Sequence, residues 1–299
     1  MRILLILLMF TGCWKQVCSQ ADSLKKFKQR KLLLGIGAVT TATVGSITLY
    51  QAWYKDYNTG SFHGFNDNTE WLQMDKAGHT LTTFQIGNAG YHACKWSGMA
   101  ENKSILIGGT SGFAYLTIIE VMDGFSEGWG FSWGDMGCNT LGAGLFTSQQ
   151  YFWKEQRIKL KFSFHQSNYW QYRPNLLGEN LGQQWLKDYN GQSYWLSVNP
   201  SSFMKKETKF PKWLNVAIGY GANGMISGHD DFVIIKSDGQ VIGNNRYRRC
   251  LLSLDVDLSR IKTKSKVLKA IFKTVNFIKV PFPALELSKG KVSGHLFYY

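Results

Sequence analysis

The sequence has little proline and few cysteines, and these absences limit the kinds of protein it can encode. Five of the 299 residues are proline and five are cysteine. No two cysteines form a Cys-x-x-Cys pair, which excludes a zinc ribbon and a thioredoxin-type redox motif. Low-complexity tracts, flexible linkers and internal repeats are also missing, so neither a disordered chain nor a repeat protein is indicated.

Acidic residues are also scarce relative to basic ones. Lysine and arginine total 34 against 20 aspartate and glutamate residues, which gives a net charge of +14. Such a balance favours an anionic partner, either nucleic acid or a membrane surface. The aromatic residues do not alternate with basic ones as in nucleic-acid-binding modules. We therefore expect membrane lipid as the partner, and no nucleic acid.

The N-terminus reads as an export signal over residues 1–20. A single basic residue, Arg2, precedes the apolar run 3–10, and small residues would allow cleavage before Gln20. An alternative is a lipoprotein signal, in which Cys13 would become the lipidated first residue. Both interpretations place the protein in the cell envelope, exported and associated with a membrane.

Residues 32–153 predict an N-terminal bundle of four helices of membrane type. The first stretch, 32–53, has 22 residues without a charge, which is long enough to cross a bilayer. A buried helix of a soluble domain is the alternative for this stretch. Helical patterns follow at 74–96, 104–122 and 132–153, and their short connections predict antiparallel neighbours.

Residues 154–299 predict a mixed helix and strand portion, so the fold class is α+β. Alternating patterns indicate strands at 159–165 and 252–258, the latter half-buried, and Asp238-Gly239 marks a hairpin over 232–242. Two short strands are predicted at 284–287 and 292–299. The stretch 264–278 is an amphipathic basic helix, which would either cover a core or lie on an anionic membrane.

Polar residues at helical spacing interrupt the apolar helices of the N-terminal part. Asp75 and His79 are four residues apart, as are Asp135 and Asn139, so each pair lies on one helix face. Glu120 stands in a helix that is otherwise apolar, where an unpaired charge is costly. If the three faces meet, they form one polar cluster. Its predicted members are Asp75, Lys76, His79, Glu120, Asp123, Ser132, Asp135 and Asn139.

These residues also carry a family resemblance. The chain has an Asp-Lys-x-x-His sequence at 75–79, a Glu-x-x-Asp sequence at 120–123, and a Gly-x-Ser-x-x-Asp-x-x-x-Asn-x-x-Gly sequence at 130–142. This pattern resembles the YfiM-like family of predicted periplasmic lipoproteins, in the extended form found in Bacteroidetes, and more distantly the VanZ-like membrane proteins. VanZ-like proteins often have Gln and Arg after the Glu, whereas Val121 and Met122 follow it here. The resemblance implies an envelope location and this residue grouping, but no chemistry.

Three interpretations of the cluster remain open. As a structural lock, Lys76 would neutralise Glu120 or Asp135, while His79 and Asn139 complete a hydrogen-bond network. As a catalytic site, His79 would act as the general base, oriented by Asp75 or Asp123, with Glu120 or Asp135 as the acid.

As a metal site, the cluster would offer one nitrogen and up to three carboxylates to zinc, manganese or iron. The candidate ligands are His79, Glu120, Asp123 and Asp135. The sequence thus predicts an exported, membrane-associated envelope protein with a structural or ligand-binding polar cluster. The alternative is a metal-dependent or acid–base hydrolase acting on an envelope lipid or glycan. The sequence identifies no cofactor.

Overall fold

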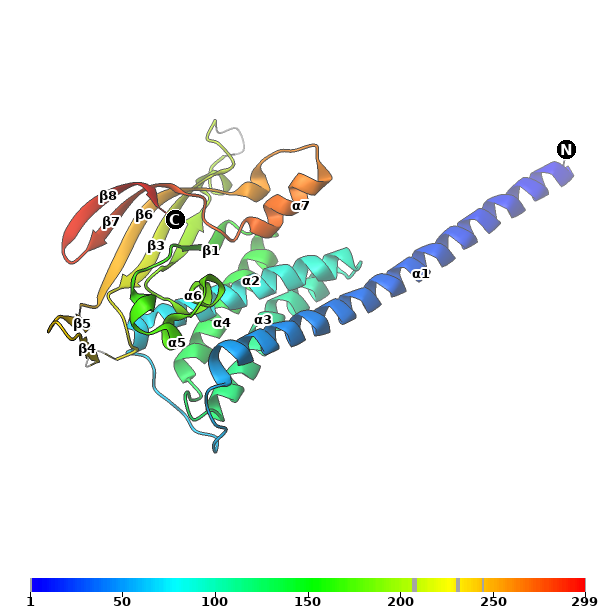
Figure 1. Cartoon of the computed structure of the whole chain (residues 1–299). Coiled ribbons are helices and arrows are strands. Elements are labelled where there is room, and N and C mark those ends of the chain that lie inside the picture. Colours follow the sequence, from blue (N-terminus) through cyan, green and yellow to red (C-terminus); the bar gives the residue numbers. More distant parts are fainter. Residues whose placement is uncertain (1, 206–208, 230–231, 244, 299) are drawn as a thin grey trace.

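A computed structural model describes residues 2–205, 209–229, 232–243 and 245–298, with side chains described from residue 25. The fold is α+β, as predicted, with a group of helices lying beside a curved antiparallel sheet (Figure 1). The helices are α1 (Arg2–Leu49), α2 (Met74–Trp96), α3 (Glu101–Gly124), α4 (Trp133–Trp153), α5 (Pro174–Leu177), α6 (Leu181–Lys187) and α7 (Lys266–Val275). The strands are β1 (Ile158–Phe164), β2 (Gln192–Val198), β3 (Leu214–Asn223), β4 (Val233–Ile235), β5 (Val241–Gly243), β6 (Tyr247–Val256), β7 (Phe282–Ser288) and β8 (Lys291–Tyr298).

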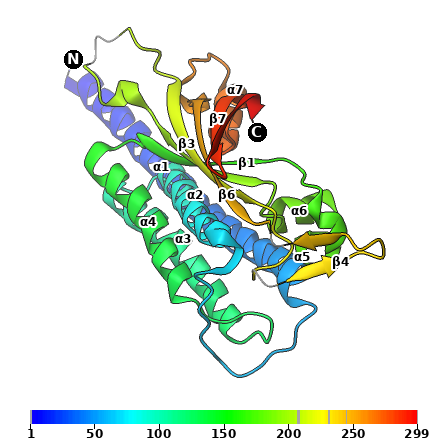
Figure 2. The ribbon, with the colours of Figure 1, turned by 90° about the vertical axis from the view of Figure 1, so that its left-hand side faces the viewer.

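Helices α2, α3 and α4 pack against one another, and α2 also contacts β1 and β2, so it lies between the other two helices and the sheet (Figure 2). Glycines allow this close packing. A Cβ atom on Gly112 would lie 2.3 Å from the carbonyl oxygen of Thr83, and one on Gly142 would lie 2.3 Å from that of Thr80. The bounds predicted for α2, 74–96, are confirmed, and α4 starts one residue after its predicted cap, Ser132.

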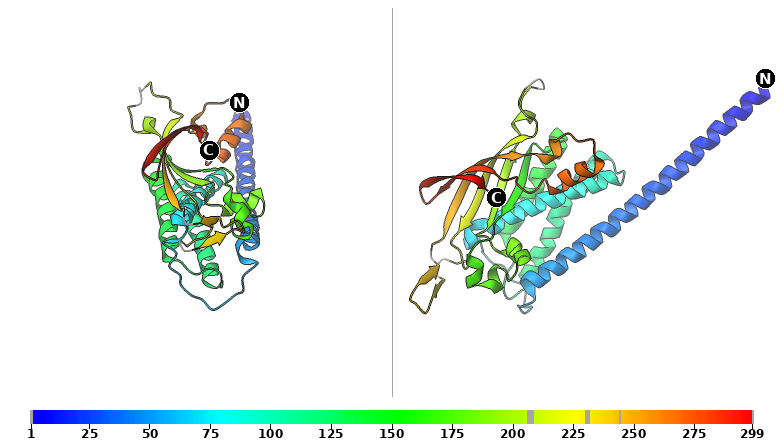
Figure 3. Two further views of the ribbon diagram at one scale, coloured as in Figure 1. Left: turned by 60° about the vertical axis from the view of Figure 1, so that its left-hand side comes forward. Right: turned by 45° about the horizontal axis from the view of Figure 1, so that its top comes forward.

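The four-helix bundle predicted for residues 32–153 is not clearly formed, because α1 meets the other three helices at few points. Arg30 stacks over the ring of Trp96, and Ser46 approaches the hydroxyl of Tyr115 at 3.4 Å. Between these points, apolar side chains such as Val39 remain exposed rather than filling a groove. The predicted signal region is continuous with the following apolar stretch in one long helix, whose N-terminal half projects away from the molecule (Figures 1 and 3).

Two helical stretches of the described chain are long and apolar enough to cross a membrane. They are Lys25–Tyr54, which includes the turn that continues α1, and Glu101–Gly124. In the first stretch, no part of the most apolar segment of 18 residues is buried. In the second stretch, 33% of the corresponding segment is buried.

Six strands form one sheet in the order β1-β2-β3-β6-β7-β8, and every neighbouring pair is antiparallel. The free edge of β1 is covered by residues 277–279. The amide of Phe162 donates to the carbonyl of Phe277, and the amide of Lys279 donates to the carbonyl of Phe162, both at 2.8 Å. Residues 277–279 pair with β1 at one edge of the sheet and then lead into β7 near the opposite edge. The sheet is accordingly strongly curled (Figure 3).

The C-terminal predictions are largely confirmed. The hairpin over 232–242 is present as β4 and β5, and the strands expected at 284–287 and 292–299 lie in β7 and β8, with residue 299 outside the described chain. The sequence predicts no strand at β2 or β3, and both lie in the sheet. The helix expected over 264–278 is α7, but the core-covering interpretation is wrong, since none of its described residues is buried.

Candidate functional site

The predicted polar residues meet at one end of the helix bundle. Helices α2 and α4 begin there and α3 ends there, so the helix-spaced pairs of three helices are brought within contact distance. Ser132 starts α4 as its N-cap, since its hydroxyl accepts a hydrogen bond from the amide of Asp135 at 3.1 Å. The residues that are joined by ion pairs or close polar contacts are Asp75, Lys76, His79, Glu120, Ser132, Asp135 and Asn139.

Lys76 is the central cation of the cluster. Its Nζ lies 2.6 Å from Asp67 Oδ1 and 2.8 Å from Asp135 Oδ1, with Asp75 Oδ2 further away at 3.7 Å. The side chain is only 9% exposed, so these carboxylates replace most of its hydration. Of the two partners that the sequence suggested for Lys76, the structure shows Asp135 and not Glu120.

His79 has polar groups at both ring nitrogens. Nδ1 lies 3.1 Å from Asn139 Oδ1 and 3.5 Å from Glu120 Oε1. Nε2 faces the carboxylates of Asp75 at 3.8 Å and Asp135 at 3.9 Å. The imidazole is therefore oriented by an amide on one side and stands between two carboxylates on the other, which is an arrangement suited to moving or sharing a proton.

Glu120 is buried, with 1% of its surface exposed, and its hydrogen bonding is incomplete. Oε2 accepts the amide hydrogen of Ser132 at 3.2 Å, but Oε1 has no hydrogen-bond partner, and neither does the buried Nδ2 of Asn139. Buried polar atoms in folded proteins are normally paired. A lock that existed only for stability would be expected to satisfy these two atoms.

Asp123 lies beside the cluster rather than within it. Its Oδ1 accepts a hydrogen bond from the hydroxyl of Tyr54 at 2.5 Å, which connects the helical turn after α1 (Tyr50–Tyr54) to the end of α3. The predicted grouping of Asp123 with His79 is therefore looser than expected, because Tyr54 occupies this carboxylate. Both residues nevertheless line the same cavity.

Two residues of the site were missed by the sequence interpretation. Asp67 accepts a hydrogen bond from Ser132 at 2.6 Å in addition to its ion pair with Lys76. Tyr189 donates to Asp75 Oδ1 at 2.8 Å across 114 residues of sequence. Asp67 stands in an irregular connector and Tyr189 precedes a turn, so neither has a periodic signal that would reveal its partner.

The ionisation of these two residues follows from their surroundings. Burial acts to raise the pKa of Asp67, but its hydrogen bonds with Asp135, Lys76 and Ser132 outweigh that effect and hold the pKa below its usual value. Burial, together with the neighbouring charge of Asp75, raises the pKa of Tyr189 well above its ordinary value. Tyr189 therefore remains a hydrogen-bond donor to Asp75 at neutral pH.

An unusual backbone segment positions the start of α2. Trp71, Leu72 and Gln73 have φ values of 46°, 51° and 62°, in the left-handed region that ordinary residues avoid. Each such residue costs about 1–2 kcal/mol. The hydroxyl of Tyr220 holds the carbonyl of Leu72, and Gly228 accepts the amide hydrogen of Trp71. The C-terminal portion thus fixes the segment that presents Asp75 and Lys76.

The cluster forms one wall of a cavity of about 610 Å³, within the usual range for small-molecule sites. Leu49 at the end of α1 and three residues of the turn that follows it, Ala52, Trp53 and Tyr54, form part of its lining. Arg173 and Lys187 from the C-terminal portion also line it. Its acidic and histidine lining comprises Asp56, Asp67, Glu70, Asp75, His79, Asp123 and Asp135. Its aromatic lining comprises Trp53, Tyr54, Tyr57, Phe65, Trp71, Tyr115, Trp129, Phe162, Trp185, Tyr189, Tyr194 and Phe277.

Three of these side chains offer metal-ligand atoms close together. One atom each from Asp75, His79 and Asp135 lies within 4.8 Å of the other two. This set differs from the predicted one, because Glu120 faces the other ring nitrogen of His79 and Asp123 is bound to Tyr54. Lys76 already neutralises Asp135 at 2.8 Å, so a divalent ion would have to compete with a buried ammonium group.

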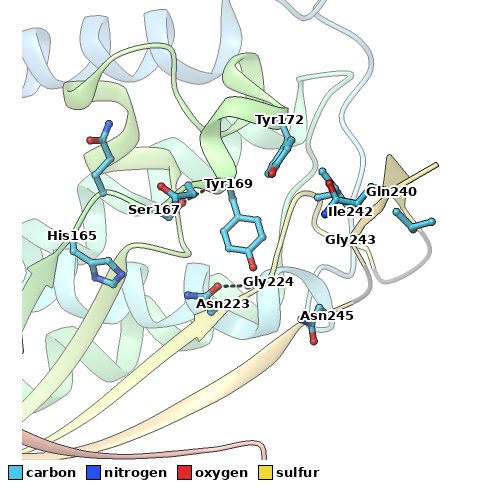
Figure 4. Close-up of a pocket in the computed structure, with 13 residues that line it drawn as sticks. His165, Ser167, Tyr169, Tyr172, Asn223, Gly224, Gln240, Ile242, Gly243 and Asn245 are labelled. Atoms are coloured by element: carbon cyan, nitrogen blue, oxygen red, sulfur yellow. Dashed lines mark hydrogen bonds between the residues drawn. The ribbon is translucent and has the colours of Figure 1, made fainter. Parts of the chain in front are cut away.

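A second cavity, of about 480 Å³, lies between the loop after β1, the end of β3 and the β4–β5 hairpin. Its described lining contains no aspartate, glutamate, lysine or arginine, and consists largely of tyrosines and amides, with one histidine, His165 (Figure 4). Tyr169 and Tyr172 contribute rings, while Asn223 and Asn245 contribute amide groups. This lining can hydrogen-bond a neutral polar molecule, and it contains none of the predicted site residues.

Residues 63–149 match the sequence family described as predicted periplasmic lipoproteins (DUF2279). The match covers less than a third of the chain, from the connector before α2 into α4, and includes every residue of the predicted cluster. The extended Bacteroidetes and VanZ-like resemblances are not part of it. No curated protein and no solved structure matches the chain. The segment that builds the cluster is therefore similar to predicted periplasmic lipoproteins of unknown function, which is consistent with an envelope location.

Proposed function

We propose that the protein is a membrane-associated envelope protein that binds an amphiphilic ligand in the cavity beside the polar cluster. Similarity to predicted periplasmic lipoproteins supports the envelope location. Exposed apolar side chains on α1 and α3, such as Val39 and Leu106, support contact of these helices with a bilayer. The net charge of +14 fits an anionic membrane surface.

The observation that carries this proposal is the composition of the cavity wall. Aromatic side chains are the largest group in the lining, and three ionisable side chains, Asp75, His79 and Asp135, converge in its wall. Such a cavity suits a molecule with an apolar part and a polar head group. Because carboxylates outnumber the basic groups in the lining, the head group should donate hydrogen bonds, as an amine or a set of hydroxyls does.

Incomplete hydrogen bonding beside His79 favours binding over a purely structural role. Glu120 Oε1 and Asn139 Nδ2 are buried and have no hydrogen-bond partner, although Glu120 Oε1 is within ion-pair distance of His79 Nδ1 at 3.5 Å. A ligand in the cavity that forms a hydrogen bond with His79 would meet a side chain that Asn139 already holds in one orientation. Preorganisation of this kind lowers the cost of ordering a binding site.

The test is binding of phosphatidylethanolamine, an amphiphile with an amine head group, to the full chain purified in detergent. We expect the Asp75→Asn and His79→Ala variants to bind about ten- to a hundredfold more weakly, because losing one charge-assisted hydrogen bond costs about 1.5–3 kcal/mol. His92→Ala is the matched control, since His92 is exposed on the same helix. Equal affinity in all four proteins, or equal binding of phosphatidylglycerol, would refute the proposal.

Acid–base hydrolysis of an envelope lipid or glycan is the second candidate. It is favoured by the position of His79 Nε2, which faces two carboxylates at 3.8 and 3.9 Å and lines the cavity. In that case wild-type protein would release head group or fatty acid from phosphatidylethanolamine vesicles, and His79→Ala would not. If the wild-type protein binds phosphatidylethanolamine but releases no product, hydrolysis is refuted and the site only binds its ligand.

A further inference from the structure

We propose that the outer face of the six-stranded sheet is a lipid-contacting surface that lies against the acyl chains of the bilayer. The outer face is defined here as the side that carries Leu196, Ile218, Leu252 and Leu285. The inference rests on the proposed membrane association, but concerns a part of the chain that lies outside both the apolar helices and the polar cluster. No sequence pattern suggested it.

The outer face is apolar and exposed across four adjacent strands. The register pairs Leu196 with Ile218, Ile218 with Leu252, and Leu252 with Leu285, so one continuous row crosses β2, β3, β6 and β7. Ile218, Leu252 and Leu285 are 58%, 49% and 53% exposed. The rows on either side contribute further exposed apolar residues, namely Val216, Leu254 and Leu287. A contiguous patch of this kind marks an interaction surface.

The inner face of the same strands is buried and combines charged and polar groups with an apolar cluster of Trp195, Ala217, Leu251, Ala284 and Tyr298. Lys161 and Asp255 are both 0% exposed and form an ion pair at 2.7 Å. Ser197 donates to Asp255 at 2.6 Å, and Arg249 donates to the carbonyls of Asn190 and Ala222 at 3.1 Å. In water-soluble sheets the apolar side is buried and the polar side is solvated. Here the exposed outer face is apolar, while the ion pair and the arginine are buried on the inner face beside an apolar cluster, as in sheets whose outer side faces lipid and whose inner side is shielded from it.

The absence of charged side chains from the apolar rows of the outer face favours lipid over a protein partner. The first and third apolar rows are about 13 Å apart along a strand, since two strand residues rise about 6.6 Å. This span is close to the hydrocarbon depth of one leaflet, half of the roughly 30 Å core. Arg248 follows on the outer face of β6 beyond Cys250, where its guanidinium donates to Gln73 Oε1 at 2.7 Å, so the apolar face ends at this position. The three apolar rows contain no charged side chain. A surface that faces lipid must be free of charge, whereas a surface that faces a protein partner need not be.

The test places nitroxide spin labels on the full chain in vesicles of phosphatidylethanolamine and phosphatidylglycerol. Ile218→Cys and Leu285→Cys report the outer face, in a chain whose natural cysteines are replaced by alanine. Ile235→Cys is the matched control, because Ile235 is an exposed isoleucine on the separate β4–β5 hairpin. Val39→Cys on α1 reports membrane insertion itself. We expect labels at 218 and 285 to collide with oxygen and to lose collisions with a water-soluble nickel chelate, unlike the label at 235.

Each other outcome overturns the inference in a recognisable way. If the label at 39 is in lipid while those at 218 and 285 meet the nickel chelate, the sheet faces water although the helix is inserted. If all the labels meet the chelate, membrane association fails as well. If the labels at 218 and 285 meet neither reagent and broaden one another across molecules, a second copy covers the face instead of lipid.

Discussion

Replacing Lys76 by methionine should lower the free energy of unfolding by about 3–5 kcal/mol, because it leaves buried carboxylates without their counter-charge. Lys76 Nζ is 2.6 Å from Asp67 and 2.8 Å from Asp135, and both side chains are mostly buried. Methionine fills a similar volume, so the loss would report the charge rather than a cavity. Thermal or urea unfolding of the detergent-purified chain measures it.

The control for this prediction lies on the same helix. Lys95 pairs with Glu101 at 2.9 Å, but both side chains are more than a third exposed. Exposed pairs of this kind contribute about 0–1 kcal/mol, so Lys95→Met should be nearly neutral. If Lys76→Met were equally neutral, Asp67 and Asp135 would have to share a proton instead of relying on the lysine, and the central role of Lys76 would be wrong.

The cluster itself could be predicted in large part from the sequence. Spacing of three or four residues determines which polar side chains share a helix face, and it correctly grouped His79 with Asp75 and Asn139 with Asp135. The helix bounds at 74–96 and the cap at Ser132 followed from local signals, namely periodicity and capping chemistry. These features depend on neighbouring residues only.

The partners that come from distant segments could not be predicted. Asp67 and Tyr189 reach Lys76 and Asp75 only because the connector before α2 and the loop before β2 fold back onto the bundle. Likewise, α1 has the composition of a bundle helix, yet it packs at few points, because composition does not tell whether lipid or protein covers an apolar helix.

Strand β6 shows the same limit most clearly. Its alternation over 252–258 correctly predicted a strand, but the usual assumption buries the leucines and exposes the polar residues. The structure does the reverse: Ser253 and Asp255 are buried, while Leu252 and Leu254 are exposed. The two-residue repeat of a strand determines that side chains alternate between the two faces of the sheet. Which of these faces is buried depends on the direction in which the sheet curls.

Replacing Gly142 by alanine should destabilise the protein by about 1–3 kcal/mol through overpacking, even though alanine is the better helix former. The new Cβ would lie 2.3 Å from the carbonyl oxygen of Thr80 and 3.1 Å from Cβ of Thr83, so α2 and α4 would have to separate. Because Thr80 follows His79 and Asn139 lies one turn before Gly142, separation would also lengthen the 3.1 Å contact between His79 and Asn139. We therefore expect reduced binding of phosphatidylethanolamine together with reduced stability.

Gly144→Ala, two residues further along α4, separates the steric cause from the change of residue type. A Cβ at Gly144 has no atom within 4 Å, so this variant should be unchanged or more stable by up to about 1 kcal/mol. Opposite signs for the two alanines, measured by unfolding in the same detergent, would show that α2 and α4 depend on backbone contact at Gly142. Equal signs would mean that the helices separate at little cost, and the cluster could then not be held rigid by this packing.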